Sequence, residues 1–229
     1  NIILFTHLYN FLNNVIIRKF DSTGTFVWEK TFGDGCHDHA SSIKSDSAGG
    51  YIFAGFTEPT NVNTPTMEVG NGSNLNGSIS TIAAPHQVSG QPVHIPWVVK
   101  IDGDGNQLWQ KTFPQYDDGV FFDVGVDSAN GYLLVGSSHH VEVIPPEVPG
   151  SEGDVLILKL DPTGSLIWEK TVGGSQRDYA YSVDFLNSGG FVIGGFSESG
   201  DGAINQNNGA SDTLLMRFST DGIELWQKT

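Results

Sequence analysis

The stretch Asp161-Pro-Thr-Gly-Ser-Leu-Ile-Trp-Glu-Lys-Thr171 decides the fold, because its pattern returns along the chain. A glycine, a tryptophan four residues later and then a Lys-Thr pair occur in the same order at four places. The four tryptophans are Trp28, Trp109, Trp168 and Trp226. Their spacings of 81, 59 and 58 residues give a period close to 58 residues, with one insertion of about 22 residues. Such self-similarity predicts a repeat architecture whose units stack on one another.

Each repeat unit is predicted to consist of β-strands. Residues 154–160 form a short apolar run, and residues 165–172 alternate with a period of two. Between them, Asp161-Pro-Thr-Gly164 fits a tight turn. Two further strands are expected at 179–186 and 191–197, and no segment of the unit has a helical pattern. We therefore expect these four consecutive strands to form one antiparallel sheet.

A four-stranded sheet that is apolar on both faces needs a neighbouring sheet on either side. A β-propeller supplies these neighbours by stacking its sheets around an axis. The sequence therefore predicts an all-β protein, a β-propeller of about four four-stranded antiparallel blades in a single domain over residues 1–229. The repeat units are expected at about 15–57, 97–138, 154–197 and 212–229, with the insertion at 58–96. The tryptophans are expected to pack between successive sheets.

The first residue is not methionine, and the last one falls inside a repeat unit. We therefore expect the chain to be part of a larger propeller, truncated at both ends.

The repeat resembles those of known propellers. Asp161-x-Thr-Gly-x-x-x-Trp168 and the matching segment from Asp21 to Trp28 are similar to the tryptophan-docking repeat of quinoprotein-type β-propellers. The longer pattern over 168–182 and 189–199 resembles repeats of bacterial and archaeal secreted or cell-surface proteins. This resemblance implies another division of the strands, in which the Gly…Trp hairpin ends one blade and the next two strands begin the following blade. Blades would then span 39–113, 121–172 and 179–229, after an incomplete first blade.

Charge and composition limit the partners. The chain has 11 basic and 26 acidic residues, a formal net charge of −15 and no basic cluster, so we expect no nucleic acid partner. It has no apolar run of 18 residues, so we expect no membrane span. Few lysines and many Gly, Ser, Asn and Thr residues favour an extracellular or cell-surface location. The single cysteine, Cys36, excludes an internal disulfide.

The variable segments fall at one place in every implied blade, between its second and third strands. They cover 58–96, 139–153 and 199–211, and in a propeller they leave the same end as the links between blades at 33–38, 114–119 and 173–178. Loops gathered at one end often form the binding face of a repeat protein. The candidate binding residues on this face are His37, Asp38, His39, Tyr116, Asp117, Asp118, His139, His140, Arg177 and Asp178.

Two segments contain metal-ligand residue types. Cys36-His37-Asp38-His39 has side chains that suit zinc or another transition metal, but adjacent loop residues rarely converge on one ion, so solvated histidines are favoured. Asp102-Gly-Asp-Gly-Asn106 imitates the start of a calcium loop, but it lacks the later glutamate and matches turns elsewhere in the repeat. We assign no metal and no cofactor from the sequence.

The sequence contains no nucleophile elbow, phosphate-binding loop or His-Glu-x-x-His motif. It therefore favours a non-catalytic binding or scaffold module of a secreted or cell-surface protein, with a protein or a glycan as its ligand. Two alternatives stay open. One is a fragment of a quinoprotein-type oxidoreductase, although the resemblance implies an adjacent-cysteine disulfide that a single cysteine cannot form. The other is a propeller carbohydrate-active enzyme with carboxylates paired across the axis.

Overall fold

The computed structural model describes residues 2–7, 14–33, 37–58, 94–116, 118–138, 153–204 and 209–229. The regular secondary structure in this part of the chain consists of β-strands. These residues include no helix that is long and apolar enough to cross a membrane. The strands are β1 (Ile2–His7), β2 (Val15–Phe20), β3 (Phe26–Phe32), β4 (His37–Ser45), β5 (Tyr51–Glu58), β6 (Ile95–Ile101), β7 (Gln107–Thr112), β8 (Val120–Val126), β9 (Tyr132–Ser138), β10 (Asp154–Leu160), β11 (Leu166–Val172), β12 (Asp178–Phe185), β13 (Phe191–Ser197), β14 (Asp212–Phe218) and β15 (Glu224–Lys228).

These strands form four antiparallel sheets, each a simple meander. Sheet A has three strands, β1-β2-β3, whereas sheet B (β4-β5-β6-β7), sheet C (β8-β9-β10-β11) and sheet D (β12-β13-β14-β15) have four each. The predicted all-β class and the predicted four-stranded antiparallel sheets are confirmed.

The predicted single sheet over 154–197 is wrong. Strands β10 and β11 complete sheet C, whereas β12 and β13 open sheet D. The short Gly-Gly-Ser segment after β11 is a passage between sheets, while the longer connection over 139–153 joins two paired strands, β9 and β10. The division implied by the resemblance is therefore the one that the structure contains.

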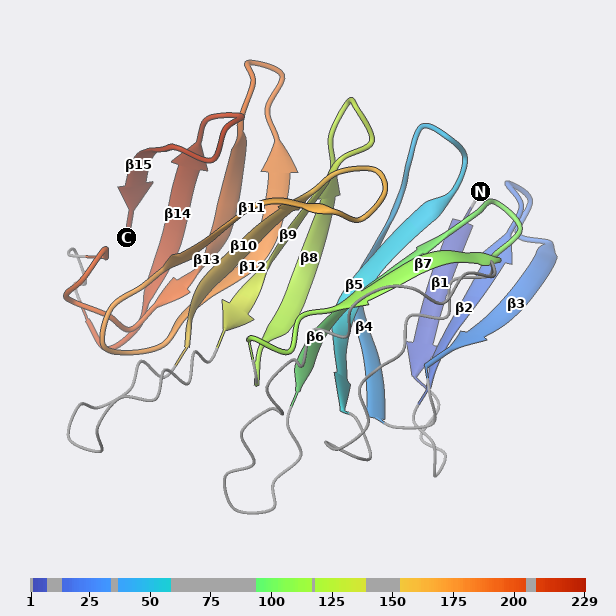
Figure 1. Cartoon of the computed structure of the whole chain (residues 1–229), viewed down its shortest axis with the longest axis horizontal. Helices are drawn as coiled ribbons and strands as arrows, with labels where there is room; N and C mark the ends of the chain where they lie inside the picture. The colour runs from blue at the N-terminus through green and yellow to red at the C-terminus, as the bar shows by residue number, and fades with distance from the viewer. Residues whose placement is uncertain are drawn as a thin grey trace, which may run out of the picture.

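Sheets A to D lie side by side in the order of the chain, like the segments of a fan (Figure 1). The first strands β4, β8 and β12 contact one another in turn, and we call them the inner strands. A hydrophobic core fills each space between neighbouring sheets. In β5, for example, Tyr51 and Phe53 belong to the core with sheet A, and Ile52 and Ala54 belong to the core with sheet C. A strand buried on both faces has the continuous apolar sequence seen here.

Three of the four repeated tryptophans pack between successive sheets, as expected from the sequence, and each of these three lies on a glycine of the following sheet. The pairs are Trp28 on Gly105, Trp109 on Gly164 and Trp168 on Gly222. Each glycine lies in the turn between the third and fourth strands of its sheet. A Cβ atom on Gly222 would lie 2.9 Å from the Trp168 ring, and the φ of 75° at Gly222 is itself one that favours glycine. The same glycine therefore closes its own turn and seats the tryptophan of the sheet before it.

The two end sheets lack this contact among the described residues. Nothing lies within 4 Å of a Cβ built on Gly24 of sheet A, and Trp226 of sheet D is 40% exposed. The same glycine and tryptophan positions of the repeat therefore occur both with a neighbouring sheet and without one.

The basic residue before each turn lies across from the tryptophan in the strand register. In sheet B the Lys100 Nζ lies 2.8 Å from a carboxylate oxygen of Asp46, and in sheet C Lys159 pairs with Asp127. Burial raises the pKa of Asp46 and Asp127, but hydrogen bonds from the lysine and from backbone amides outweigh burial and lower the pKa of both. These ion pairs stabilise the end of each sheet at which the tight turns lie. At the same end Asp102 accepts bonds from the amides of Asp104 and Asn106, as a turn aspartate does.

Candidate functional site

Each inner strand contains one extra residue, a β-bulge, at the same place. The pairing with the second strand shifts between residues 40 and 42 in β4, between 121 and 123 in β8 and between 180 and 182 in β12. The extra residues are Ser41, Phe122 and Tyr181. A bulge changes the direction of a side chain and is frequent beside functional sites.

A glycine on the second strand makes room for each bulge. These glycines are Gly55, Gly136 and Gly195, and each lies across from the residue before the bulge. A Cβ on Gly55 would overlap the carbonyl oxygen of His39, and the other two glycines meet equivalent carbonyl groups. None of the three has a positive φ, so they are needed for space and not for backbone freedom.

The bulged residues line one cleft of about 510 Å³, together with His39, Ala40, Phe56 and Val120. The His39 and Phe56 rings, which are cross-strand partners in sheet B, stack at 5.0 Å with an angle of 5°. Phe122 of sheet C contacts Tyr181 of sheet D edge to face at 4.9 Å. Tyr181 is 49% exposed, so this end of the cleft offers an aromatic ring to solvent.

A second aromatic pair supports this wall. Tyr179 and Phe196 take the places in sheet D that His39 and Phe56 take in sheet B, with ring centres 5.1 Å apart. Phe196 also lies 5.7 Å from Tyr181. Burial raises the pKa of Tyr179, and the Asp118 and Glu198 carboxylates contribute in the same direction.

A row of polar side chains crosses sheet B beside the cleft. His37 and Glu58 are cross-strand partners, and the Glu58 Oε1 lies 2.9 Å from His37 Nδ1 and 3.0 Å from His94 Nε2. The other ring nitrogen of His94 lies 3.1 Å from Asp118 Oδ1. We call His37, Glu58, His94 and Asp118 the polar row. The His94 ring is 4.3 Å from the Phe56 ring, so the row adjoins the aromatic cleft.

Asp123 holds the inner strands together. Its Oδ1 accepts a hydrogen bond of 2.6 Å from Ser42 of β4, and its Oδ2 accepts one of 3.1 Å from the amide of Val183 in β12. Lys44 adds an ion pair at 3.4 Å. One carboxylate of sheet C therefore connects sheets B and D, and it fixes the strands that form the cleft.

The structure places nine of the ten predicted binding residues in three groups, and Arg177, described below, lies apart from them. His37 and Asp118 belong to the polar row with Glu58 and His94, and His39 lines the cleft beside it. Asp38, Tyr116 and Asp178 are only 1%, 5% and 0% exposed, so their side chains do not form a binding face. Asp117, His139 and His140 lie outside the described residues, as do Cys36 and His86.

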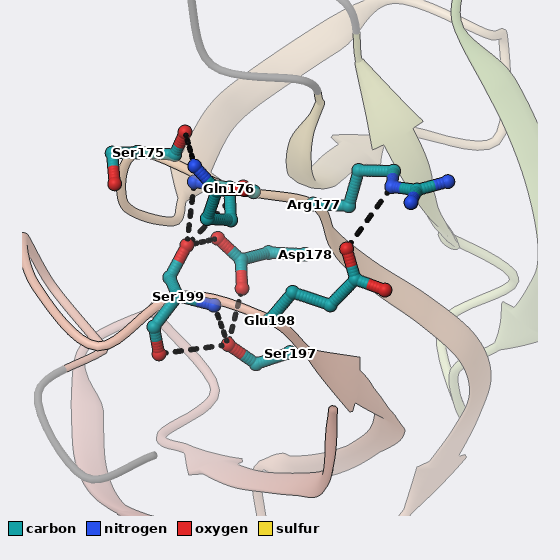
Figure 2. A network of polar contacts seen from close by, with 7 residues as sticks. All are labelled: Ser175, Gln176, Arg177, Asp178, Ser197, Glu198 and Ser199. Atoms are coloured by element: carbon teal, nitrogen blue, oxygen red, sulfur yellow. Dashed lines mark hydrogen bonds and ion pairs between the residues drawn. The ribbon is translucent and has the colours of Figure 1, made fainter. Parts of the chain in front are cut away.

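Asp178 differs from its neighbour Arg177, although both are among the binding residues predicted from the sequence. Its carboxylate accepts hydrogen bonds from the hydroxyls of Ser197 and Ser199 (Figure 2). It also accepts one from the amide of Gly174. It therefore organises the passage between sheets C and D. Arg177 does stay exposed and pairs with Glu198 at 3.1 Å. Tyr116 is structural as well, since its hydroxyl donates to Glu169 at 2.5 Å and its pKa is raised by burial and by that carboxylate.

The sequence did not identify Ser41, Phe56, Glu58, Phe122 or Tyr181 as site residues. One available signal was a repeated glycine in the second strand of each four-stranded sheet, at Gly55, Gly136 and Gly195. Each lies five residues after the glycine that precedes this strand, Gly50, Gly131 or Gly190. No three His, Cys, Asp or Glu side chains are grouped to hold a metal ion in the part of the chain that the structure describes.

Comparisons with known proteins add little. No family model and no curated protein matches the chain. It is similar to a solved structure, a protein of unknown function from Bacteroides caccae, with 16% identity, 98% of this chain and 92% of that chain covered, and a TM-score of 0.23. At that TM-score the similarity supports no inference about fold or ligand.

Proposed function

We propose that this chain is a non-catalytic binding module of a secreted or cell-surface protein, built as a β-propeller, and that it binds a glycan in the cleft on its inner strands. The propeller is supported by the side-by-side sheets and by the same tryptophan-on-glycine packing at three successive interfaces. The extracellular location is supported by composition.

The observation that carries the proposal is the set of three bulges. They bring Ser41, Phe122 and Tyr181, from three different sheets, to one cleft. Aromatic rings offer flat apolar surface to the apolar face of a sugar ring, and the polar row offers partners for its hydroxyl groups. The net charge of −15 disfavours an acidic polysaccharide and favours a neutral or cationic glycan.

The size of the cleft favours a glycan over a folded protein as ligand. Sites for small molecules and sugar units are concave and measure roughly 300–1,000 Å³, whereas stable protein interfaces bury roughly 800 Å² per partner over broad surfaces. A cleft of about 510 Å³ with aromatic walls belongs to the first kind.

A glycan screen followed by calorimetry on the strongest ligand tests this function. Tyr181→Ala and Phe122→Ala should each weaken binding by about tenfold or more, because each removes a ring from the wall. Leu108→Ala is the matched control, since Leu108 is 59% exposed on the outer strand β7 and should leave affinity unchanged. If no glycan binds, or if the ring variants bind as tightly as the control, the proposal is wrong.

A further inference from the structure

We propose that the cleft recognises a quaternary ammonium group, so that its ligand is a glycan bearing a choline-like substituent. This inference rests on the glycan-binding function proposed above and names the chemical group that the same site selects. It comes from the placement of aromatic rings in the cleft beside the carboxylates of the polar row.

The polar row brings carboxylates next to the cleft. Two of its four members, Glu58 and Asp118, are carboxylates, and the other two are imidazoles. Carboxylates are ionised near neutral pH, so the row places negative charge beside the aromatic rings.

Phe56 lies between the polar row and the cleft. It lines the cleft, and its ring lies 4.3 Å from His94 and 5.0 Å from His39. Glu58 follows two residues later on β5, so both side chains lie on the same face of the strand. A cation beside Phe56, Phe122 and Tyr181 would contact aromatic rings while lying within the field of the row.

The lining of the cleft favours a quaternary ammonium over a primary one. None of the residues that line the cleft has a carboxylate, and Glu58 and Asp118 lie in the polar row beside it. A primary ammonium has N–H donors that need acceptors at hydrogen-bond distance, whereas a quaternary ammonium has none. A quaternary group needs only aromatic surface and negative potential, which the cleft and the row offer.

The basic side chains around the site are themselves paired with acids. Lys44 of β4 lies 3.4 Å from Asp123, and Arg177 in the passage before β12 lies 3.1 Å from Glu198. The charge of −15 on the whole chain adds to the attraction of cations.

Calorimetric titration with choline chloride and with its uncharged isostere, 3,3-dimethylbutan-1-ol, tests the inference. Choline should bind at least about tenfold more tightly than the isostere, because shape and apolar surface are matched and only the charge differs. Glu58→Gln should remove most of this preference, and Phe56→Leu should weaken choline binding. Asp104→Asn is the control for loss of one negative charge, since Asp104 is exposed in the turn between β6 and β7, and it should change nothing.

The inference is overturned if choline and the isostere bind with equal affinity. It is also overturned if the double variant Glu58→Gln and Asp118→Asn keeps the preference for choline over the isostere. If glycans bind but choline does not, only this inference fails. If choline binds and no glycan does, the glycan function fails and the ammonium site stands.

Discussion

Replacing Gly222 by alanine tests whether the repeated glycine exists to seat a tryptophan. The matched variant is Gly24→Ala, because both glycines end the same kind of turn, with φ values of 75° and 83°. An alanine in this left-handed region costs roughly 1–2 kcal/mol at either site. At Gly222 the new Cβ would also lie 2.9 Å from the Trp168 ring, whereas nothing lies within 4 Å at Gly24.

The Trp168 ring cannot withdraw freely, since it stacks near Phe191 in the core between sheets C and D. Overpacking of this kind adds about 1–3 kcal/mol. Gly222→Ala should therefore destabilise the protein by about 2–5 kcal/mol and Gly24→Ala by about 1–2 kcal/mol. Urea unfolding followed by circular dichroism measures both. Equal losses at the two sites would show that backbone conformation alone selects the glycine, and the docking argument would be refuted.

Three further predictions concern the carboxylates of Asp178 and Asp127 and the bulge of β12. Asp178→Ala should destabilise by roughly 3–5 kcal/mol in urea unfolding, because it leaves buried hydroxyl and amide donors without an acceptor, whereas Arg177→Ala should cost less than about 1 kcal/mol. Gly195→Ala should weaken glycan binding in calorimetry, because its Cβ would displace the backbone of β12 at the bulge. The lowered pKa of Asp127 means that the stability it contributes is present above its ordinary value of 3.8 and is lost as the pH falls through the lowered value. Asp127→Asn should therefore be less stable than the parent at pH 7, and the gap should close as the pH falls below 3.8 in acid unfolding curves. A constant gap would contradict the Lys159 pairing.

The strands and the packing of the tryptophans were predictable, because both depend on short-range features. A turn glycine and a tryptophan four residues later define one hairpin, and its repetition requires equivalent neighbours. The division into sheets was harder to predict, because a period has no natural starting point. The same four strands give the same period wherever the unit is taken to begin, and only the pairing of β10 with β9 settles the division.

The site was predictable only in part. The histidines at the loop-rich end stood out as residue types; His39 lines the cleft, and His37 belongs to the polar row beside it. Asp38 and Asp178 looked like loop residues, yet they fall at the start of inner strands and lie in the interior. The aromatic residues escaped notice because a bulge interrupts the alternation of the strand, so the usual period assigns the face of Tyr181 wrongly.

The central claim is that the three bulges build the ligand site, and amide chemical-shift mapping by NMR tests it most directly. On addition of the strongest glycan ligand, the largest shifts should fall on the bulged residues Ser41, Phe122 and Tyr181 and on Phe56. The outer hairpin turns at Gly24, Gly105, Gly164 and Gly222 should stay unchanged. Shifts gathered on those outer turns, with none at the bulges, would contradict the account.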